Sequence, residues 1–227
     1  MAAAHTAFTP GSFLARLEDR ERAGLLEIGI ERAIPTGAIL IFEHEVEARV
    51  VLLLNGRVKV THVDRHGREL LLNIRDPGDV LGELALIDRE PVSATICTLE
   101  PVVAQLIGSA AFRAYLEATP RVAVVLLEII AGRFREELST RLQFTESDTM
   151  GRLAARILEL SRRYGQRNTD HTTVPMPISQ QELGSWAGAS RAGAAQALQS
   201  MRELGWIRTE RGLLTIADEH ALRGRAG

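Results

Sequence analysis

The stretch from Pro177 to Ala217 restricts the possible folds of this chain more than any other segment. Ser179 followed by Glu182 forms a capping box, in which a hydroxyl and a carboxylate satisfy the unpaired amide groups at a helix start. Gly188 follows where a tight turn between crossing helices needs a residue without a side chain. Ser190 then caps a second helix. In this order, the signals predict two short helices joined by a tight turn.

The second helix has one face that is committed to packing. Small and apolar residues recur along it at intervals of three and four, namely Ala194, Ala197, Leu198 and Met201. Gly205 ends the helix, and WIRTERGLLTIA then alternates like two strands around a turn at residues 210–212. Two helices, a tight turn and a hairpin together predict a winged helix-turn-helix.

The opposite face of the second helix carries the side chains that read DNA in such a motif. Arginine bonds guanine and glutamine bonds adenine in a bidentate way when the first turn of a helix enters the major groove. The alternative is a helical hairpin with one arginine on a solvated face, but the ordered caps, turn and hairpin favour DNA binding. The predicted DNA-binding residues are Gln180, Ser190, Arg191, Gly193, Gln196 and Arg211.

The bulk composition suits two domains that differ in charge. The chain has 227 residues, of which 45% are hydrophobic, so it is long enough for a sizeable core and for more than one domain. Residues 1–146 carry 16 basic and 21 acidic groups, a net charge of −5, whereas residues 147–227 carry 11 and 8, a net charge of +3. A basic C-terminal part suits contact with a phosphate backbone at one end of the chain.

The lone Cys97 excludes an internal disulfide and cannot by itself hold a zinc finger or an iron–sulfur cluster. Its apolar surroundings predict a buried strand residue. The N-terminal residues have no charged leader followed by an apolar core, and no apolar run has the length that a bilayer span needs. We therefore expect a cytoplasmic protein without membrane contact.

The N-terminal part is rich in short β-type runs. Residues 13–28 read as a helix, and between Ile34 and Ile107 the runs are AILIF, RVVLLLNG, RVKVTHVD, RELLLNI, SATICTL and VVAQLI. The dipeptides Asn55-Gly56 and His66-Gly67 are typical of hairpin turns. This close spacing predicts an all-β barrel or jelly roll in place of alternating strands and helices.

A short helix at residues 110–116 precedes a long one, which Pro120 opens and which runs to about Thr145. The valine-rich first two turns are expected to pack on the β-roll. The later turns carry a narrower apolar stripe at the four-three-four spacing of a two-stranded coiled coil. The predicted dimer interface is Leu127, Ala131, Phe134 and Leu138.

Residues 152–164 form a further amphipathic helix, followed by a polar loop or exposed hairpin. The predicted fold class is therefore α+β, with three parts. They are a β-roll effector-type domain at 1–118, a long dimerisation helix at 119–146 and a winged helix-turn-helix DNA-binding domain at 147–227.

The order of these parts resembles the CRP/FNR family of bacterial transcription regulators over nearly the whole chain. The motifs that carry the resemblance are GRVKV at 56–60, PGDVLGELALIDREPVSAT at 77–95, GRLAARIL at 151–158 and ISQQELGSWAGASRAGAAQALQSM at 178–201. The resemblance implies a homodimer, double-stranded DNA with two half-sites, RNA polymerase as a partner and no enzymatic activity.

The resemblance also implies an effector pocket, which departs from the family pattern. In members that bind cyclic nucleotides, a GELA motif and a later RSA segment grip the ligand, and the arginine holds the phosphate. Val92 stands at that arginine position, and valine offers neither charge nor donor. Glu137 and Leu138 stand where such members carry a hydroxyl pair for the base. The candidate pocket residues are Gly82, Glu83, Leu84, Val92, Ser93, Ala94 and Glu137.

These departures predict a degenerate pocket that is effector-independent or takes an unidentified effector; the alternative is a cAMP-responsive regulator. Arg89 is the candidate replacement for the missing arginine, and the alternative role of Glu83 is a structural cap of the short pocket helix. The family's iron–sulfur branch needs several thiolates, and this chain has one. His44, His62 and His66 lack the spacing of metal ligands, so we expect surface histidines and no metal.

Two functions from other classes compete with a DNA-binding regulator. The first is a ligand-binding module whose helix-turn-helix contacts protein, and Arg191 with Gln196 on one face argues against it. The second is an enzyme on the β-barrel. The sequence contains no catalytic triad, paired-carboxylate motif or phosphate loop that supports this possibility.

Overall fold

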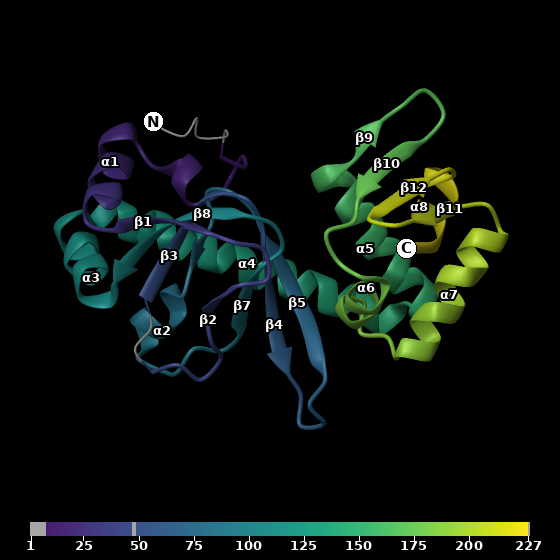
Figure 1. Ribbon diagram of the computed structural model, residues 1–227, viewed down its shortest axis with the longest axis horizontal. Coiled ribbons are helices and arrows are strands. Elements are labelled where there is room, and N and C mark those ends of the chain that lie inside the picture. Colours follow the sequence, from purple (N-terminus) through teal and green to yellow (C-terminus); the bar gives the residue numbers. More distant parts are fainter. Residues whose placement is uncertain (1–7, 47–48, 227) are drawn as a thin grey trace. The chain divides into compact units, whose positions relative to one another are not determined.

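The computed structural model describes residues 8–46 and 49–226, which divide into two compact units, Met1–Arg135 and Glu136–Gly227. The division lies inside the long helix α4 (Pro120–Glu146), so this helix belongs partly to each unit. Figure 1 shows the order of the elements along the chain.

The N-terminal unit contains two four-stranded antiparallel sheets. The first has the strand order β1-β8-β3-β6 and the second β2-β7-β4-β5. The strands are β1 (Ile30–Ile34), β2 (Ile39–Ile41), β3 (Arg49–Asn55), β4 (Val58–Val63), β5 (Glu69–Arg75), β6 (Val80–Leu81), β7 (Thr95–Thr98) and β8 (Val102–Gly108). The β-roll is confirmed, and the sequence patterns missed only the short strands β1 and β6.

Strand β3 is the centre of this unit because both of its faces are buried. Val51 and Leu53 point into an apolar cluster between the two sheets, which also contains Ile41 from β2 and Ile96 from β7. The alternate residues Val50, Leu52 and Leu54 point into a second cluster, where helices cover the outer face of the first sheet. The two cores therefore share one strand.

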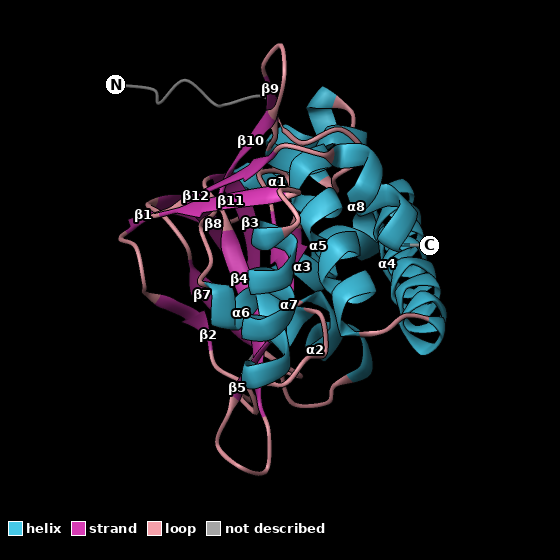
Figure 2. Cartoon of the chain, turned by 90° about the vertical axis from the view of Figure 1, so that its right-hand side faces the viewer, coloured by secondary structure: helices cyan, strands magenta, loops and turns pink. Residues whose placement is uncertain are grey.

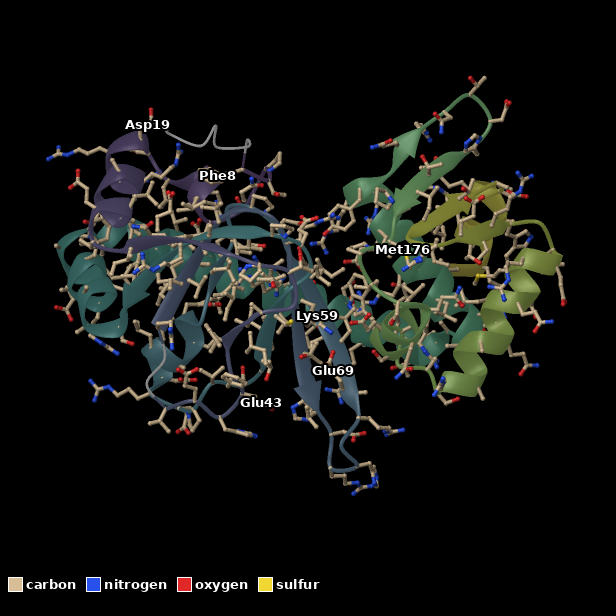
Figure 3. The ribbon with its side chains drawn as sticks, in the orientation of Figure 1. Phe8, Asp19, Glu43, Lys59, Glu69 and Met176 are labelled. Carbon is tan, nitrogen blue, oxygen red and sulfur yellow. The ribbon has the colours of Figure 1, made fainter. Side chains whose placement is uncertain are left out.

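One predicted hairpin is wrong and the other is confirmed. Gly67 has a φ of 74° between β4 and β5, which pair with each other, and an ion pair of 2.6 Å joins Lys59 to Glu69 across them (Figure 3). Gly56 has a φ of 79° between β3 and β4, but these strands lie in different sheets. Its turn carries the chain from one sheet to the other, because β3 is already paired with β8 and β6.

The expected helix at residues 13–28 is broken in two. A single 3₁₀ turn, η1 (Leu14–Arg16), is followed by Leu17 with an extended ψ of 147°. Helix α1 (Asp19–Glu27) then starts afresh, because Glu18 and Glu21 form a capping box of their own. The apolar residues still reach one core, since Phe13, Leu14 and Leu25 are fully buried together.

Three more helices complete the N-terminal unit. They are α2 (Glu83–Asp88), α3 (Ser109–Ala118) and the first part of α4. Val122, Val125, Leu126 and Ile129 of α4 are buried against the helical cluster, as expected of its valine-rich turns. Cys97 lies on β7 but is only partly buried, because its neighbours Ile96 and Thr98 occupy the inward-facing positions of that strand.

The C-terminal unit is a winged helix-turn-helix with an additional helix that the sequence patterns missed. Figure 2 shows that helix, α8, beside α5. One sheet has the order β11-β12-β10-β9. The elements are α5 (Thr149–Tyr164), β9 (Gln166–Arg167), β10 (Thr172–Pro175), α6 (Gln180–Trp186), α7 (Arg191–Glu203), β11 (Ile207–Glu210), β12 (Leu213–Ile216) and α8 (Glu219–Ala226). No helix within the described ranges is long and apolar enough to span a bilayer.

An ion pair between the half-buried Arg133 and the buried Glu83 joins α4 to the β-roll. The Nη1 atom of Arg133 lies 2.7 Å from Oε1 of Glu83, the first residue of α2. Its Nη2 atom lies 3.1 Å from Oδ1 of Asp79 and donates to the carbonyl of Val80 at 3.0 Å. One guanidinium group therefore joins α4 to two carboxylates and a backbone carbonyl of the β6–α2 segment.

Burial raises the pKa of the Glu83 carboxyl above its ordinary value, and Arg133 opposes this shift without cancelling it. The unfolded chain has the ordinary pKa, so the folded protein binds this proton more tightly. The stability linked to that proton is fully present below the ordinary pKa and is lost as the pH rises through the raised pKa. The stabilisation of the Glu83 carboxylate by Arg133 is therefore most important at neutral pH.

We predict that Arg133→Met lowers the free energy of unfolding of the N-terminal unit by about 3 to 5 kcal/mol at pH 7, because it leaves a buried carboxylate without its counter-charge. Adding Glu83→Gln should recover most of this loss, and the loss should shrink as the pH falls. Urea titrations measure the effect, with Arg135→Met on an exposed position of the same helix as the control. A single variant as stable as the control contradicts the prediction.

Candidate functional site

The first helix of the DNA-reading motif starts with the predicted capping box. The Ser179 hydroxyl accepts a hydrogen bond from the Glu182 amide at 3.1 Å, and the Glu182 carboxylate accepts one from the Ser179 amide at 2.7 Å. At the start of α7 the Ser190 hydroxyl accepts from the Gly193 amide at 3.1 Å. Both helix starts are therefore fixed by side chains that the sequence identified.

The turn between α6 and α7 depends on small residues. Gly188 has a φ of 61°, a left-handed conformation that glycine adopts without strain. The Ala189 amide donates to the carbonyl of Gly184 at 2.9 Å. A Cβ atom at Gly184 would lie 2.6 Å from the Cβ of Ala194, so the two helices cross at very close range. The sequence interpretation identified Gly188 but overlooked Gly184.

The two faces of α7 divide as predicted. Ala194, Ala197, Leu198 and Met201 are buried, whereas Arg191 and Gln196 are exposed on the opposite face. Gln180, Ser190 and Arg211 are exposed as well, and Gly193 is half-buried. Within the described ranges, no side-chain hydrogen bond or ion pair holds the guanidinium of Arg191 or of Arg211.

The wing adds one cation that the sequence interpretation overlooked. Arg208 lies on β11 and is exposed, and Arg211 lies at the tip of the β11–β12 hairpin beside Gly212, whose φ is 74°. Arg202 of α7 points to the wing instead, where its guanidinium lies 3.4 Å from the Thr209 hydroxyl. The alternation of WIRTE would have identified Arg208 as outward-facing, since Ile207 is the buried neighbour.

The candidate effector pocket is built around the start of α2. Gly82 has a φ of 77°, and a Cβ atom there would lie 2.4 Å from the carbonyl of Arg49, so only glycine fits. Glu83 follows, buried and paired with Arg133. Arg133 is the pocket residue that the sequence patterns missed, because a lone arginine on a long helix carries no local signal of its partner.

Val92, which stands at the position of the phosphate arginine, has an apolar environment. Val92 and Ala94 are buried, and Val92 lies in the same cluster as Ile41 of β2. Backbone hydrogen bonds of 2.8 and 3.1 Å join Val92 to His44 and Glu45 of the loop after β2. Ser93 and Leu84 are exposed, and so is Glu137 on α4.

Arg89, the candidate substitute for the missing arginine, caps the end of α2 with a φ of 64° and has an exposed side chain. Among the described residues it makes no side-chain hydrogen bond or ion pair. The arginine that does bind α2 is Arg113 of α3, which donates to the carbonyl of Leu86. Nothing in this geometry directs Arg89 into the pocket.

The three histidines do not form one cluster, because two approach Glu43 and the third lies in the β4–β5 turn. His62 contacts the Glu43 carboxylate at 2.5 Å, and His44 lies 3.8 Å from it with an exposed side chain; Glu43 is labelled in Figure 3. The amide of His66 donates to Asp64 in the β4–β5 turn. In the described part of the chain, no group of three or more His, Cys, Asp or Glu side chains is arranged to hold a metal ion.

The predicted dimer stripe lies on the exposed side of α4. Leu127, Phe134 and Leu138 are 59%, 64% and 45% exposed, and Ala131 is half-buried between them. Val124 and Leu142 extend the exposed apolar stripe toward both ends of the helix. The chain alone leaves this stripe in contact with water.

Comparison with known proteins identifies both parts of the chain. A family model described as a cyclic nucleotide-binding domain matches residues 31–119, and one described as a Crp-like helix-turn-helix domain matches residues 151–225. The structure of the c-di-GMP-responsive global regulator CLP from Xanthomonas campestris is similar with a TM-score of 0.78 at 16% identity, covering 88% of this chain and 99% of that one. That likeness shows the fold alone.

Two curated relatives cover most of the chain. The global nitrogen regulator of Synechococcus elongatus is 26% identical over 207 residues, which is 88% of this chain and 90% of that protein. The CRP-like cAMP-activated global transcriptional regulator of Mycobacterium tuberculosis is 31% identical over 192 residues, which is 85% of this chain and 86% of that protein. With both domain models matched in the same order, this chain belongs to the CRP/FNR family of transcriptional regulators, whose members bind DNA and are typically dimeric.

Proposed function

We propose that this chain is a homodimeric, sequence-specific DNA-binding regulator in which two copies of α7 read two half-sites. The observation that carries the proposal is the division of α7 into a buried small-residue face and an exposed face with Arg191 and Gln196. The guanidinium of Arg191 and the amide of Gln196 suit guanine and adenine edges in the major groove. Gln180, Ser190 and Arg211, which are exposed, would contact phosphates.

The exposed stripe on α4 supports the homodimer. An apolar row at coiled-coil spacing gains stability when a second copy covers it, at roughly 25 cal/mol for each Å² removed from water. A dimer also presents two reading helices to a site with two-fold symmetry. RNA polymerase is the further partner that a regulator of this family would meet on DNA, and the cytoplasm is where we expect it to act.

The effector pocket is proposed to be degenerate, so that the protein works without an effector or with one still to be identified. A cyclic phosphate needs a cation that is free to approach it. Val92 provides none, no contact directs the exposed side chain of Arg89 into the pocket, and Arg133 is already paired with Glu83 and Asp79. A phosphate at Arg133 would have to compete with the Glu83 and Asp79 carboxylates for the guanidinium.

A cAMP-responsive regulator is the second candidate. It is favoured by the relative from Mycobacterium tuberculosis, a CRP-like cAMP-activated regulator that is 31% identical to this chain. Gly82, Glu83 and Ala94 match the family's pocket motifs, and Gly82 and Glu83 lie at the start of α2. The two candidates differ in one measurable quantity, the affinity of the protein for cAMP.

The first test concerns base readout. A site is first selected from a random DNA pool, and Arg191→Ala should then weaken binding to it by about 1 to 3 kcal/mol and relax the preference at one base pair. Arg162→Ala, which removes an exposed charge from α5, is the control and should leave base preference unchanged. Equal ratios of specific to random binding in Arg191→Ala and wild type would show that Arg191 does not carry the base readout.

The second test concerns the dimer. Replacing Phe134 by Glu and Leu138 by Lys places charges in the proposed apolar seam, so sedimentation should show monomers at micromolar concentration. Binding to a site with two half-sites should weaken on the order of 100-fold, because each half is then read separately. Phe134→Leu with Leu138→Ile keeps the seam apolar and should stay dimeric. A monomeric wild type would refute the proposed assembly.

The third test concerns cAMP. Calorimetry should give a dissociation constant nearer millimolar than micromolar, because a lost charged hydrogen bond is worth ~1.5 to 3 kcal/mol and the hydroxyl pair for the base is missing as well. Val92→Arg should tighten binding about tenfold or more by restoring a cation. Micromolar binding by the wild type that Glu83→Ala abolishes would establish the second candidate instead. No gain from Val92→Arg would show that the pocket differs from the family at more than this position.

A further inference from the structure

Two arginines on α5 connect the end of the long helix with the helix-turn-helix. Arg152 and Arg156 are one helical turn apart, and both contact the last residues of α6 and the last turns of α4. All of these residues belong to the C-terminal unit. Neither arginine lies on α7 or on the wing, so the proposed DNA contacts do not use them.

Arg156 is enclosed between two aromatic rings. Its guanidinium carbon lies 4.5 Å from the ring centroid of Trp186 in α6 and 5.1 Å from that of Phe144 in α4. Its Nη1 atom lies 2.7 Å from the Glu159 carboxylate, and its Nε donates to the carbonyl of Trp186 at 3.3 Å. Only 8% of Arg156 is exposed, so the cation is almost completely removed from water.

Arg152 grips the same two elements through backbone carbonyls. Its Nε donates to the carbonyl of Ala187, which ends α6, at 2.8 Å. Its Nη1 donates to the carbonyl of Ser147, in the junction between α4 and α5, also at 2.8 Å. The guanidinium lies 5.9 Å from the centroid of the Phe144 ring as well. Phe144 is therefore covered by both arginines.

The geometry of these contacts is specific to arginine. A planar guanidinium stacks on rings and donates from its edge at the same time, whereas a lysine ammonium is a single point charge. An apolar side chain would fill the space between Phe144 and Trp186 but would leave the carbonyls of Trp186 and Ala187 without these donors. The arginines thus fix both the distance between α6 and the end of α4 and the direction in which α6 points.

We infer that Arg152 and Arg156 are positioning residues that hold the reading helix α7 at a fixed orientation to the end of α4. The link runs from Phe144 through the arginines to Trp186 and Ala187, and from there through the Gly188 turn to α7. This inference rests on the proposed function, because in a dimer it sets the separation of the two reading helices. Two half-sites can be bound at once only when that separation matches their spacing.

The first experiment needs no DNA. Phe144→Leu should speed amide hydrogen exchange of Gly188 and Ala189 about tenfold, because their hydrogen bonds to Ser185 and Gly184 lose the support of the stack. Arg156→Lys should do the same while keeping the charge. The control is Arg162→Lys, on an exposed position of α5. Unchanged exchange at the turn in Phe144→Leu, with the rest of the unit folded as in the wild type, would overturn the inference.

The second experiment separates positioning from general destabilisation. Affinities are measured for a selected duplex with two half-sites and for one with a single half-site. Phe144→Leu and Arg156→Lys should reduce the advantage of the double site about tenfold or more, while single-site affinity stays within about twofold of the wild type. A parallel loss on both duplexes would mean that the arginines only stabilise the unit, which contradicts the inference.

The two proposals fail in different ways. A wild-type protein that binds no selected duplex refutes the proposed function, and the exchange measurements still decide whether the arginines couple α4 to the turn. A wild type that prefers the double site, combined with variants that keep this preference, refutes the positioning role alone. If Arg156→Lys does not fold, the half-buried Phe144 supplies the variant for both experiments.

Discussion

The burial of strand β3 on both faces is the constraint on which the N-terminal unit depends. A strand with apolar side chains on alternate sides must be covered twice, by a second sheet and by a layer of helices. The second sheet supplies Ile41 and Ile96, and the helices supply residues such as Phe112 and Leu126. Helix α4 is therefore held to the roll at its start, and the Arg133 ion pair continues that attachment one turn beyond the last buried residue, Ile129.

Charged groups connect α4 to other elements at two places along its length. Near its middle, Arg133 meets two carboxylates of the roll, and near its end Phe144 lies under two arginines of α5. Between these places the helix exposes an apolar stripe to water. A buried charge is a costly connector, but removing one partner is costlier still, so such pairs hold elements in one arrangement. The same helix thus carries three separate features, which are the Arg133 attachment to the roll, the exposed apolar stripe and the Phe144 contact with α5.

Local signals explain which features the sequence revealed. The caps at Ser179 and Ser190 and the glycine at 188 act within a few residues, so both helices of the reading motif were predicted correctly. The break at Leu17 was missed because apolar spacing continues across it, and α8 was missed because Leu222 is its one large apolar side chain. Arg133 and Arg156 obtain their roles from residues 50 and 30 positions away, Glu83 and Trp186, which no local pattern shows.

The close crossing of α6 and α7 has a consequence for how specificity can change. Gly184 and Ala194 have almost no side chain between them, so they determine how far α7 projects from the body of the unit. A larger residue at either position would push the helix outward or tilt it, and every side chain of its exposed face would move together. The depth to which the helix enters a groove is thus adjustable from the buried side, by residues that never meet a base.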